Sequence, residues 1–472
     1  MRKNWWFLSW VLILAIAFGL RFYRLGQVPT GLYWDEVAML VDAKSLAQTG
    51  SDMHGNFWLT TMFPSYGDYK LPVYLWLAAG AVKIFGVSEW ALRLPSALAG
   101  VTTVIIAGWL AQELARLTQV KKLLASIAGL TTALIIAISP WSVAFSRAGF
   151  EGHLGQLLLA SAVLLVVKAK KHWWLMIFAP VVAALATYAY YSVRFVWPVV
   201  LIVTAGAVFW PWSKWSALKS WLGILVLAKK IFLWLLMPLL IYLLCLIPMF
   251  QSSFYAPSQQ FRLTADSILN QHDFALESNF LREQAGNTIV DRLLFHRHWL
   301  LIKALLKNLS AHLSINFLFL SGDINLRHGT GQHGLFLLPF LPFLFIGLYY
   351  LWQQHRSAWL ILLSWWLTAL APASVPLTVP HALRSLNALV PLAIIIGFGL
   401  ARGVEWLIKL KTIQKQAAVS VVFVLLTGLA LVQYLHYYYL VYPVKSHQFW
   451  QGNYKQEAQR ILTAPDQQTA QE

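Results

Sequence analysis

Residues 31–36 read Gly-Leu-Tyr-Trp-Asp-Glu, and they follow the first long apolar run of the chain, residues 5–20 (WWFLSWVLILAIAFGL). A helix needs roughly 20 apolar residues to cross the hydrocarbon core of a bilayer, which is about 30 Å thick. The six residues therefore place two neighbouring carboxylates, Asp35 and Glu36, where the chain leaves its first membrane span. No small-residue cleavage site follows the run, so we expect an uncleaved span.

The composition of the whole chain agrees with a membrane protein. Of its 472 residues, 59% are hydrophobic and only 11% are charged, whereas soluble domains carry about 25% charged residues. The apolar runs are continuous and do not alternate, which favours helices over a closed barrel. The net charge of +18 does not indicate nucleic-acid binding, because the Lys and Arg residues fall between the apolar runs and not on one basic face.

Eleven apolar runs are predicted to span the membrane, so the expected fold class is an all-α polytopic membrane protein of about 11 transmembrane helices. They cover residues 5–22, 93–111, 123–141, 153–167, 173–190, 195–212, 231–250, 334–352, 357–373, 384–401 and 417–437. A further run at 72–85 would be about 21 Å long as a helix, which is short for a span. We expect a short interfacial or re-entrant helix there, in the first outer loop.

The distribution of charge predicts the orientation. With a cytoplasmic N-terminus and eleven crossings, the cytoplasmic pieces are rich in Lys and Arg and hold only two acids, Glu113 and Glu405. Lys and Arg are retained on the cytoplasmic side, so this arrangement is expected. The C-terminus then lies outside. The expected outer segments are 23–92, 142–152, 191–194, 251–333, 374–383 and 438–472.

We divide the chain into a transmembrane domain, residues 1–442, and a polar, extracytoplasmic C-terminal tail, residues 443–472. The two largest outer loops of the domain are 23–92 and 251–333. Within the second loop, Thr288–Leu313 is predicted to be one amphipathic helix with a basic and an apolar face. Such a helix can lie along a membrane surface.

The first outer loop holds four charged candidates for chemistry: Asp35, Glu36, Asp68 and Lys70. Adjacent residues do not share a face of a helix or strand, so Asp35 and Glu36 are not expected to form one dyad. One of them can act on a substrate while a cation holds the other. The alternative for Asp35 is a helix N-cap. Lys70 is a candidate phosphate ligand, with a snorkelling interfacial lysine as the alternative.

Later outer segments place charges at the ends of apolar runs, where charged residues are candidates for function. Arg147 and Glu151 are four residues apart and share a face if they lie on one helix, where they either pair or complete an outer cavity. Arg194 and Arg384 are further candidate cations. The alternative for Arg194 is a lipid headgroup anchor.

No local motif of a metal site, a phosphate-binding loop or a serine nucleophile is present. Asp68, His328 and His381 are candidate substrate or metal contacts, and His328 lies in the glycine-rich polar turn 321–331. A divalent metal held by Asp, Glu and His side chains of separate loops stays open, and no cofactor is assigned.

Residues 20–160 resemble the membrane-embedded GT-C glycosyltransferases, among them the protein O-mannosyltransferases of family 39 and the lipid A aminoarabinose transferases. The matching pieces are YWDE at 33–36, YKLPVYLW at 69–76, FGVSEWALRLPS at 85–96, and Ser-Pro at 139–140 followed by Arg147 and Glu151. Their order and spacing carry the resemblance. The chain departs from it at Tyr69, where the aminoarabinose transferases have Glu, and at Glu151, where relatives often have Asp.

The resemblance implies an integral-membrane glycosyltransferase that moves a sugar from a polyprenyl-phosphate-linked donor to an extracytoplasmic acceptor, with inversion at the anomeric carbon. Asp35 looks like the acidic residue of the first loop that acts as base or orients the acceptor, and Lys70 resembles the phosphate-binding lysine. The candidate catalytic residues are Asp35, Glu36 and Glu151. The candidate donor-phosphate ligands are Lys70, Arg147, Arg194 and Arg384.

The partners implied are the lipid-linked sugar, a protein, lipid or glycan acceptor, and the lipid bilayer of a bacterial or archaeal plasma membrane. A transporter or flippase for a lipid-linked sugar is the main alternative. Such a protein usually has polar residues at mid-membrane, and this chain keeps nearly all its charges at the ends of the spans. A glycan ligase or polymerase and a non-catalytic scaffold are further alternatives.

Overall fold

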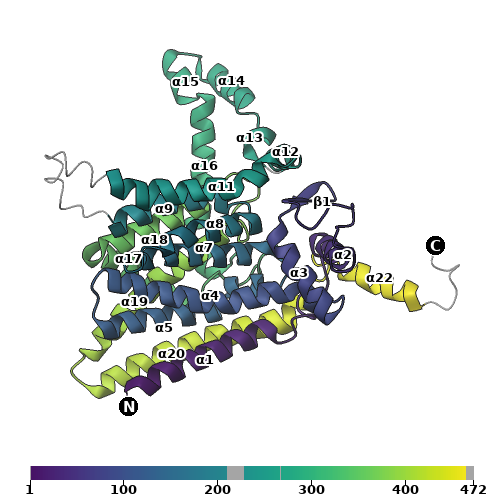
Figure 1. The fold of residues 1–472 in the computed structure, drawn as a ribbon. Helices are drawn as coiled ribbons and strands as arrows, with labels where there is room; N and C mark the ends of the chain where they lie inside the picture. Colours follow the sequence, from purple (N-terminus) through teal and green to yellow (C-terminus); the bar gives the residue numbers. More distant parts are fainter. Residues whose placement is uncertain (1, 210–227, 266, 464–472) are drawn as a thin grey trace.

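The computed structural model describes residues 2–209, 228–265 and 267–463. Within these ranges the regular secondary structure is helical apart from one two-stranded hairpin and an isolated bridge between Ser51 and Phe57. Most of the long helices run along one common direction and form a bundle (Figure 1). They are α1 (Arg2–Phe22), α4 (Glu89–Leu117), α5 (Lys122–Ile138), α7 (Glu151–Lys168), α8 (Leu175–Ala189), α9 (Val193–Phe209), α11 (Met237–Gln251), α17 (Leu341–Gln354), α18 (Arg356–Leu370), α19 (Leu389–Ile408) and α20 (Ile413–His436).

Seven helices of the described residues are long and apolar enough to cross a membrane, and four apolar helices are shorter, α3 (Pro72–Phe85), α5, α8 and α9. The chain is an integral, multi-pass membrane protein, so the predicted all-α polytopic fold class is confirmed. Each of the eleven predicted spans overlaps a helix, but the number of crossings stays a prediction. The end of the run at 195–212 and most of the loop 213–230 lie outside the described residues.

Glycines let neighbouring helices approach closely. Gly108 of α4 faces Gly129 of α5, where an added Cβ would meet the backbone oxygen of the other residue at 2.8–2.9 Å. On α17 and α19, a Cβ at Gly347 or Gly399 would collide with the backbone of the facing helix. Small residues serve this purpose in membranes, where close van der Waals packing and not hydrophobic exclusion drives helix association.

The first outer loop leaves and returns at one end of the bundle. It contains α2 (Trp34–Thr49), the antiparallel strands β1 (Phe63–Ser65) and β2 (Asp68–Lys70), and then α3. The short helix predicted at 72–85 is present with those bounds, beginning with Pro72 and ending before Gly86. It packs against α2 and α4 through buried side chains such as Leu75 and Val82. This loop covers the end of the bundle where the charged candidates gather.

The two ends of the bundle differ in charge. The turns between α4 and α5 and between α19 and α20 lie away from α2 and β1 (Figure 1). These turns and the adjoining helix ends carry the basic residues Arg116, Lys121, Lys122, Arg402, Lys409 and Lys411. The separation agrees with the predicted clustering of Lys and Arg on one side, and which side faces the cytoplasm stays a prediction.

The chain after α11 forms an arm of five helices, α12 (Tyr255–Ala265), α13 (Ile268–Gln271), α14 (Phe274–Ala285), α15 (Ile289–Leu294) and α16 (Arg297–Leu313). Figure 1 shows α14 and α15 projecting away from the bundle. The prediction of one helix over Thr288–Leu313 is wrong. His296 has an extended backbone and accepts a hydrogen bond from the His298 amide, which separates α15 from α16.

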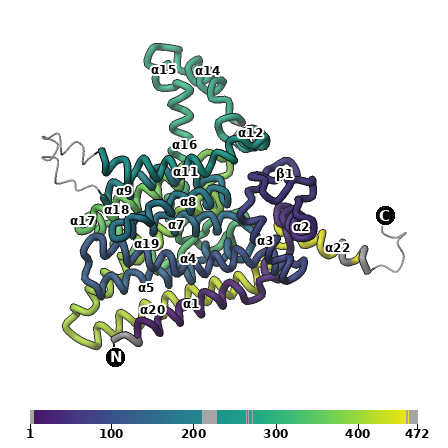
Figure 2. The backbone as a smooth tube through the Cα atoms, viewed as in Figure 1, coloured from purple at the N-terminus to yellow at the C-terminus, as the bar shows by residue number. Residues whose placement is uncertain are grey.

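The chain that follows the last long helix, α20, returns to the end of α1 (Figure 2). The Tyr439 hydroxyl donates to the Leu20 carbonyl at 2.8 Å. Trp450 is buried against Tyr33 and Phe150, so the chain after α20 returns to the first outer loop. The remaining short elements are α6 (Pro140–Phe145), α21 (Tyr442–Lys445), α22 (Gly452–Thr463), η2 (Phe232–Leu236), η3 (Asn316–Leu320), η4 (Leu338–Phe340), η5 (Pro372–Ser374), η6 (Leu386–Ala388) and η7 (Tyr437–Val441).

Candidate active site

The first turn of α2 gives its two carboxylates different environments. Glu36 is fully buried and pairs with the buried Arg93 of α4, each carboxylate oxygen lying 3.0 Å from a guanidinium nitrogen. The Gly149 amide also donates to Glu36 Oε1 at 2.6 Å. The Asp35 side chain is instead 36% exposed. The alternative in which Asp35 caps the helix is wrong, because Tyr33 holds the N-cap position and makes no side-chain cap.

Two buried arginines bind the backbone between α1 and α2. Arg93 donates to the carbonyl oxygens of Leu25, Pro29 and Gly31. Arg147 donates to those of Leu20, Arg21, Arg24 and Val28. Arg147 precedes α7 and donates its hydrogen bonds to these carbonyl oxygens. The alternative in which it pairs with Glu151 on one helix is therefore wrong.

The hairpin β1–β2 brings Lys70 to Asp35. Lys70 Nζ lies 2.5 Å from Asp35 Oδ1 and 3.4 Å from Asp68 Oδ2, and its side chain is 8% exposed. Burial lowers the pKa of Lys70, but Asp35, Glu151 and Asp68 raise it by more, so the pKa lies above the ordinary value of 10.5. Lys70 is therefore a cation at neutral pH, and its partner Asp35 is the exposed member of the pair.

A cation from the arm completes this array. Arg262 of α12 donates to both oxygens of Asp68, at 3.0 and 3.2 Å, and lies over the Tyr191 ring at 3.7 Å. Burial lowers the pKa of Arg262, but Asp68 and Tyr191 raise it by more. Asp35, Lys70, Asp68 and Arg262 thus form a row of alternating charges, which we call the ion-pair chain.

Two more predicted residues lie near the ion-pair chain. Glu151, at the start of α7, lies within electrostatic range of Lys70, Asp35 and Arg262. Arg384 lies within electrostatic range of Tyr190, as Glu151 and Arg262 do.

Arg194 uses only part of its hydrogen-bonding capacity within the described residues. Its Nη2 donates to Gln259 of α12 at 2.7 Å, while Nε and Nη1 are buried and have no hydrogen-bond partner in the described part of the chain. The guanidinium also lies over the Tyr191 and Phe195 rings at 5.0 and 5.1 Å. Two buried donors of a cation therefore remain for a ligand.

His328 and His381 are brought together in a separate cluster, which also contains Asp323. Ligand atoms of these three residues all lie within 4.8 Å of one another. The two imidazole rings stack with their centroids 4.3 Å apart. Burial, together with His328 and nearby cations, holds the pKa of His381 well below its usual range, so its ring is neutral.

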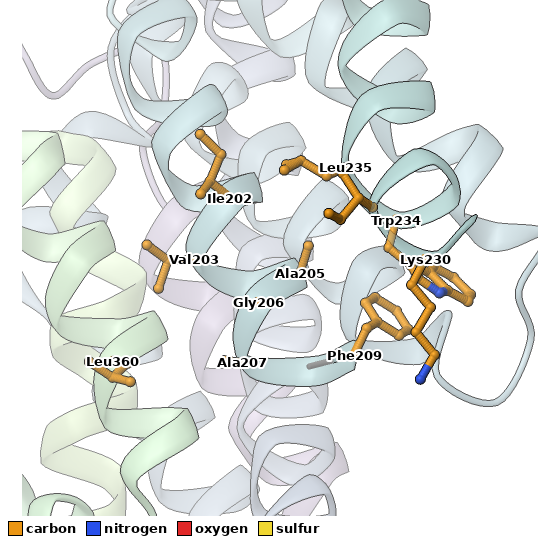
Figure 3. A pocket seen from close by; sticks show the side chains of 11 residues that line it. Ile202, Val203, Ala205, Gly206, Ala207, Phe209, Lys230, Trp234, Leu235 and Leu360 are labelled. Carbon is orange, nitrogen blue, oxygen red and sulfur yellow. The ribbon is translucent and has the colours of Figure 1, made fainter. Parts of the chain in front are cut away.

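An apolar cavity of about 490 Å³ lies between α9, η2 and α18, and Figure 3 shows Ile202, Phe209, Trp234 and Leu360 among its lining residues. Its only charged lining residue in the described chain is Lys230. Ala205 of this cavity follows Arg194 by eleven residues, or about 16 Å along the helix. The cavity is thus separate from the charged residues at the other end.

Comparison with known proteins rests on structure alone, because no protein-family model and no curated protein matches the chain. The AglB oligosaccharyltransferase of Archaeoglobus fulgidus, solved with an inhibitory peptide and a dolichol-phosphate, matches with a TM-score of 0.52 and 14% identity over 94% of this chain and 56% of its own. ArnT of Cupriavidus metallidurans in the apo state matches with a TM-score of 0.50 and 15% identity over 94% of this chain and 74% of its own.

The fold is of the GT-C type. A further structure of the archaeal oligosaccharyltransferase, in complex with Zn and sulfate, matches with a TM-score of 0.50 and 13% identity over 98% of this chain and 56% of its own. The chain spans little more than half the length of the archaeal enzyme. The expected GT-C fold is confirmed at low identity, whereas the resemblance to the family 39 O-mannosyltransferases stays a prediction.

Three charged residues of these clusters were not predicted from the sequence. Arg262 lies in a polar helix with no motif around it, and only the docking of α12 on β2 brings it to Asp68. Arg93 was hidden at the start of a predicted span, although a lone charge in an apolar run is itself a signal. Asp323 lay within the glycine-rich turn but was not singled out, and its spacing to His381 reveals nothing.

Proposed function

We propose that the chain is a glycosyltransferase that moves a sugar from a polyprenyl-phosphate-linked donor to an acceptor, with inversion at the anomeric carbon. The observation that carries the proposal is the contact of a buried cation, Lys70, with a half-exposed carboxylate, Asp35. AglB, whose fold this chain shares, was solved with a dolichol-phosphate, and this supports a lipid-phosphate donor.

The leaving group of this reaction is a lipid phosphate, which gains negative charge as its bond to the sugar breaks. Preorganised cations stabilise charge that develops in a transition state. Lys70 and Arg262 both contact the carboxylate of Asp68. The phosphate of the bound sugar donor would replace that carboxylate between the two cations. Arg194 adds two buried donors without partners, and we assign Arg384 to the same phosphate site.

Donor binding then activates the base. When the phosphate pairs with Lys70, Asp35 loses this ion-pair partner. Asp35 is partly exposed and can then contact an acceptor. Asp35 accepts the proton of the acceptor hydroxyl or amide while the acceptor atom bonds to the anomeric carbon and the carbon–oxygen bond to phosphate breaks. Attack from the face opposite the phosphate inverts the configuration. A general base of this kind contributes about 10²–10⁴ in rate.

The remaining predicted residues take other roles in this proposal. Glu151 lies close enough to orient the sugar or the acceptor. Both oxygens of Glu36 and both Nη atoms of Arg147 have partners within the protein, so we assign the two residues structural roles rather than catalysis or phosphate binding. Asp68 holds Lys70 and Arg262 in position before the donor binds.

We place the reaction on the extracytoplasmic face of a bacterial or archaeal plasma membrane. The basic turns then lie in the cytoplasm with the N-terminus, and the C-terminus lies outside. The archaeal enzyme of the same fold was solved with an acceptor peptide, which supports a peptide as the first acceptor to try.

The test is donor turnover by the purified full chain in lipid. Polyprenyl-phosphate-linked hexose or pentose is supplied with a crude envelope extract as acceptor, and release of the free lipid phosphate is followed. We expect release by the native chain and a loss of about 10²–10⁴ for Asp35→Asn. Glu457→Gln, a carboxylate removal at a side chain that is 60% exposed on α22, is the matched control.

Normal turnover by Asp35→Asn would refute the role of Asp35 as base. If no donor yields free lipid phosphate, the transferase proposal fails. Flux of the intact lipid-linked sugar across proteoliposomes would then support a transporter.

A further inference from the structure

The cluster of Asp323, His328 and His381 is distinct from the ion-pair chain. Asp323 and His328 come from the turn between η3 and η4, whereas His381 comes from the loop between η5 and η6. Side chains from these two segments lie close together in the cluster. We propose that the cluster binds one Zn²⁺ ion, which fastens the turn 321–334 to the loop 375–385.

The donor set decides the kind of metal. Two imidazoles and one carboxylate are ligands that Zn²⁺ takes readily, with a fourth position open to water. Mg²⁺ and Ca²⁺ prefer shells made of oxygen and are disfavoured by two histidines. Ferrous iron accepts the same three ligand types, so the identity of the metal belongs to the test.

The distance between two of the three ligand atoms fits a small tetrahedral ion. Zinc–ligand bonds of about 2.0–2.1 Å place neighbouring tetrahedral ligand atoms about 3.3 Å apart. His328 Nδ1 lies 3.4 Å from Asp323 Oδ2, and the ligand atom of His381 completes a group within 4.8 Å. His381 Nδ1 is 3.4 Å from the Arg384 amide. This is a long hydrogen bond, and it would be lost if His381 bound the ion through Nδ1.

Asp323 is buried and the two histidines are partly buried, and neighbouring groups orient the ligands. Asp323 is 3% exposed, and its Oδ2 accepts a hydrogen bond from the Ala382 amide at 2.8 Å. His328 Nδ1 is buried without a hydrogen-bond partner in the part of the chain that the structure describes. Partners that orient ligands in this way are typical of metal sites. An orphaned nitrogen beside a buried carboxylate and a second imidazole is a site for a cation.

The surroundings limit access of water and define the electrostatic balance. The His328 ring packs against Phe145 and Phe150, with centroids 6.2 and 6.1 Å away. Two cations, Arg327 and Arg384, lie within electrostatic range of His381 and disfavour a metal ion. Asp323 therefore supplies the charge that makes binding favourable, and its removal should be the most damaging.

The ion would also position part of the candidate active site. Arg384 follows His381 by three residues in the same loop and lies within electrostatic range of Tyr190. Fixing His381 to the turn 321–334 restrains the loop that carries Arg384. The metal would thus act through the backbone, and no step of sugar transfer is assigned to it.

Metal content of the purified full chain tests the proposal. The chain is prepared in detergent without chelators, loaded with Zn²⁺, dialysed and measured by mass spectrometry of the metals. We expect about one zinc per chain, the number that one three-ligand site holds. Asp323→Asn and His381→Ala should each lower the zinc content at least about tenfold, because each removes one of three ligands.

His333→Gln is the matched control, since His333 lies on the same turn and bonds Thr330 instead of the cluster. It should keep its zinc. Replacement of zinc by Co²⁺ in the native chain needs no variant and should give the visible absorption of a four-coordinate site. A native chain that retains neither zinc nor cobalt overturns the proposal, as does a folded His381→Ala chain that retains a full equivalent. Iron in place of zinc overturns the assignment of the metal.

Discussion

Asp35 and Glu36 are neighbours in the sequence, but they form two very different ion pairs. The Glu36–Arg93 pair is 0% exposed on both sides and uses both carboxylate oxygens. The Asp35–Lys70 pair uses one carboxylate oxygen, and Asp35 is 36% exposed. A saturated buried pair fixes the backbone around it, whereas a half-open pair can exchange its partner for a ligand. We therefore assign a structural role to Glu36 and a reactive role to its neighbour Asp35.

The largest effect on stability is expected from Glu36→Gln. This change leaves the Arg93 cation buried without its counter-charge, which typically destabilises a protein by about 3–5 kcal/mol. Asp35→Asn leaves the Lys70 cation with the carboxylate of Asp68 and should therefore destabilise the chain less than Glu36→Gln does. Thermal unfolding of both variants in detergent measures the difference. Equal stability of the two variants would contradict the contrast drawn between the pairs.

A smaller effect is expected on donor binding. Lys70→Met or Arg262→Gln each removes one charged donor to a phosphate, and such hydrogen bonds contribute about 1.5–3 kcal/mol, or about 10–150-fold in affinity. Titration of the purified chain with a polyprenyl phosphate measures the dissociation constant. Arg292→Gln, on the exposed helix α15 of the arm, is the matched control and should bind as the native chain does. Unchanged affinity in Arg262→Gln would remove this residue from the phosphate site.

The smallest effect concerns Asp42, a third carboxylate of α2. Burial raises the pKa of Asp42 from 3.8 to about 6, although the Met53 amide donates to it. A raised pKa means that the folded chain binds the proton more tightly, so this contribution to stability is complete below pH 4 and is lost as the pH rises through about 6. Asp42→Asn should remove that part of the pH dependence.

Melting temperatures of the native chain and Asp42→Asn between pH 4 and 7 check this expectation. The native chain should lose more stability than the variant over this range. A parallel pH dependence of the two chains would mean that Asp42 titrates at its ordinary pKa.

Much of the fold could be predicted because it depends on local composition. Continuous apolar runs predict helices wherever they occur, and all eleven predicted runs overlap a helix. The bounds of the short helix at 72–85 follow from Pro72 at its start and Gly86 after its end. The break between α15 and α16 was missed because residues 288–313 keep a helical pattern of apolar residues through His296.

The site was predictable only in part. Asp35 and Lys70 stood out because they flank apolar runs in a recognisable order, and the structure brings them together. Arg147 and Arg194 looked alike in the sequence, since both are cations at span ends. The fold gives Arg147 four backbone carbonyls and leaves two donors of Arg194 without hydrogen-bond partners in the described chain. No sequence pattern distinguishes those two outcomes.

The sequence by itself determined that this chain is a helical membrane protein with its charges gathered in loops, because hydropathy acts residue by residue. Only the tertiary structure decided which charges meet. Lys70 and Arg262 share Asp68 although 192 positions separate the two cations, and His381 reaches Asp323 from a different loop. Such contacts depend on how whole helices pack. Their energies come from burial and partner geometry, which no local stretch of sequence contains.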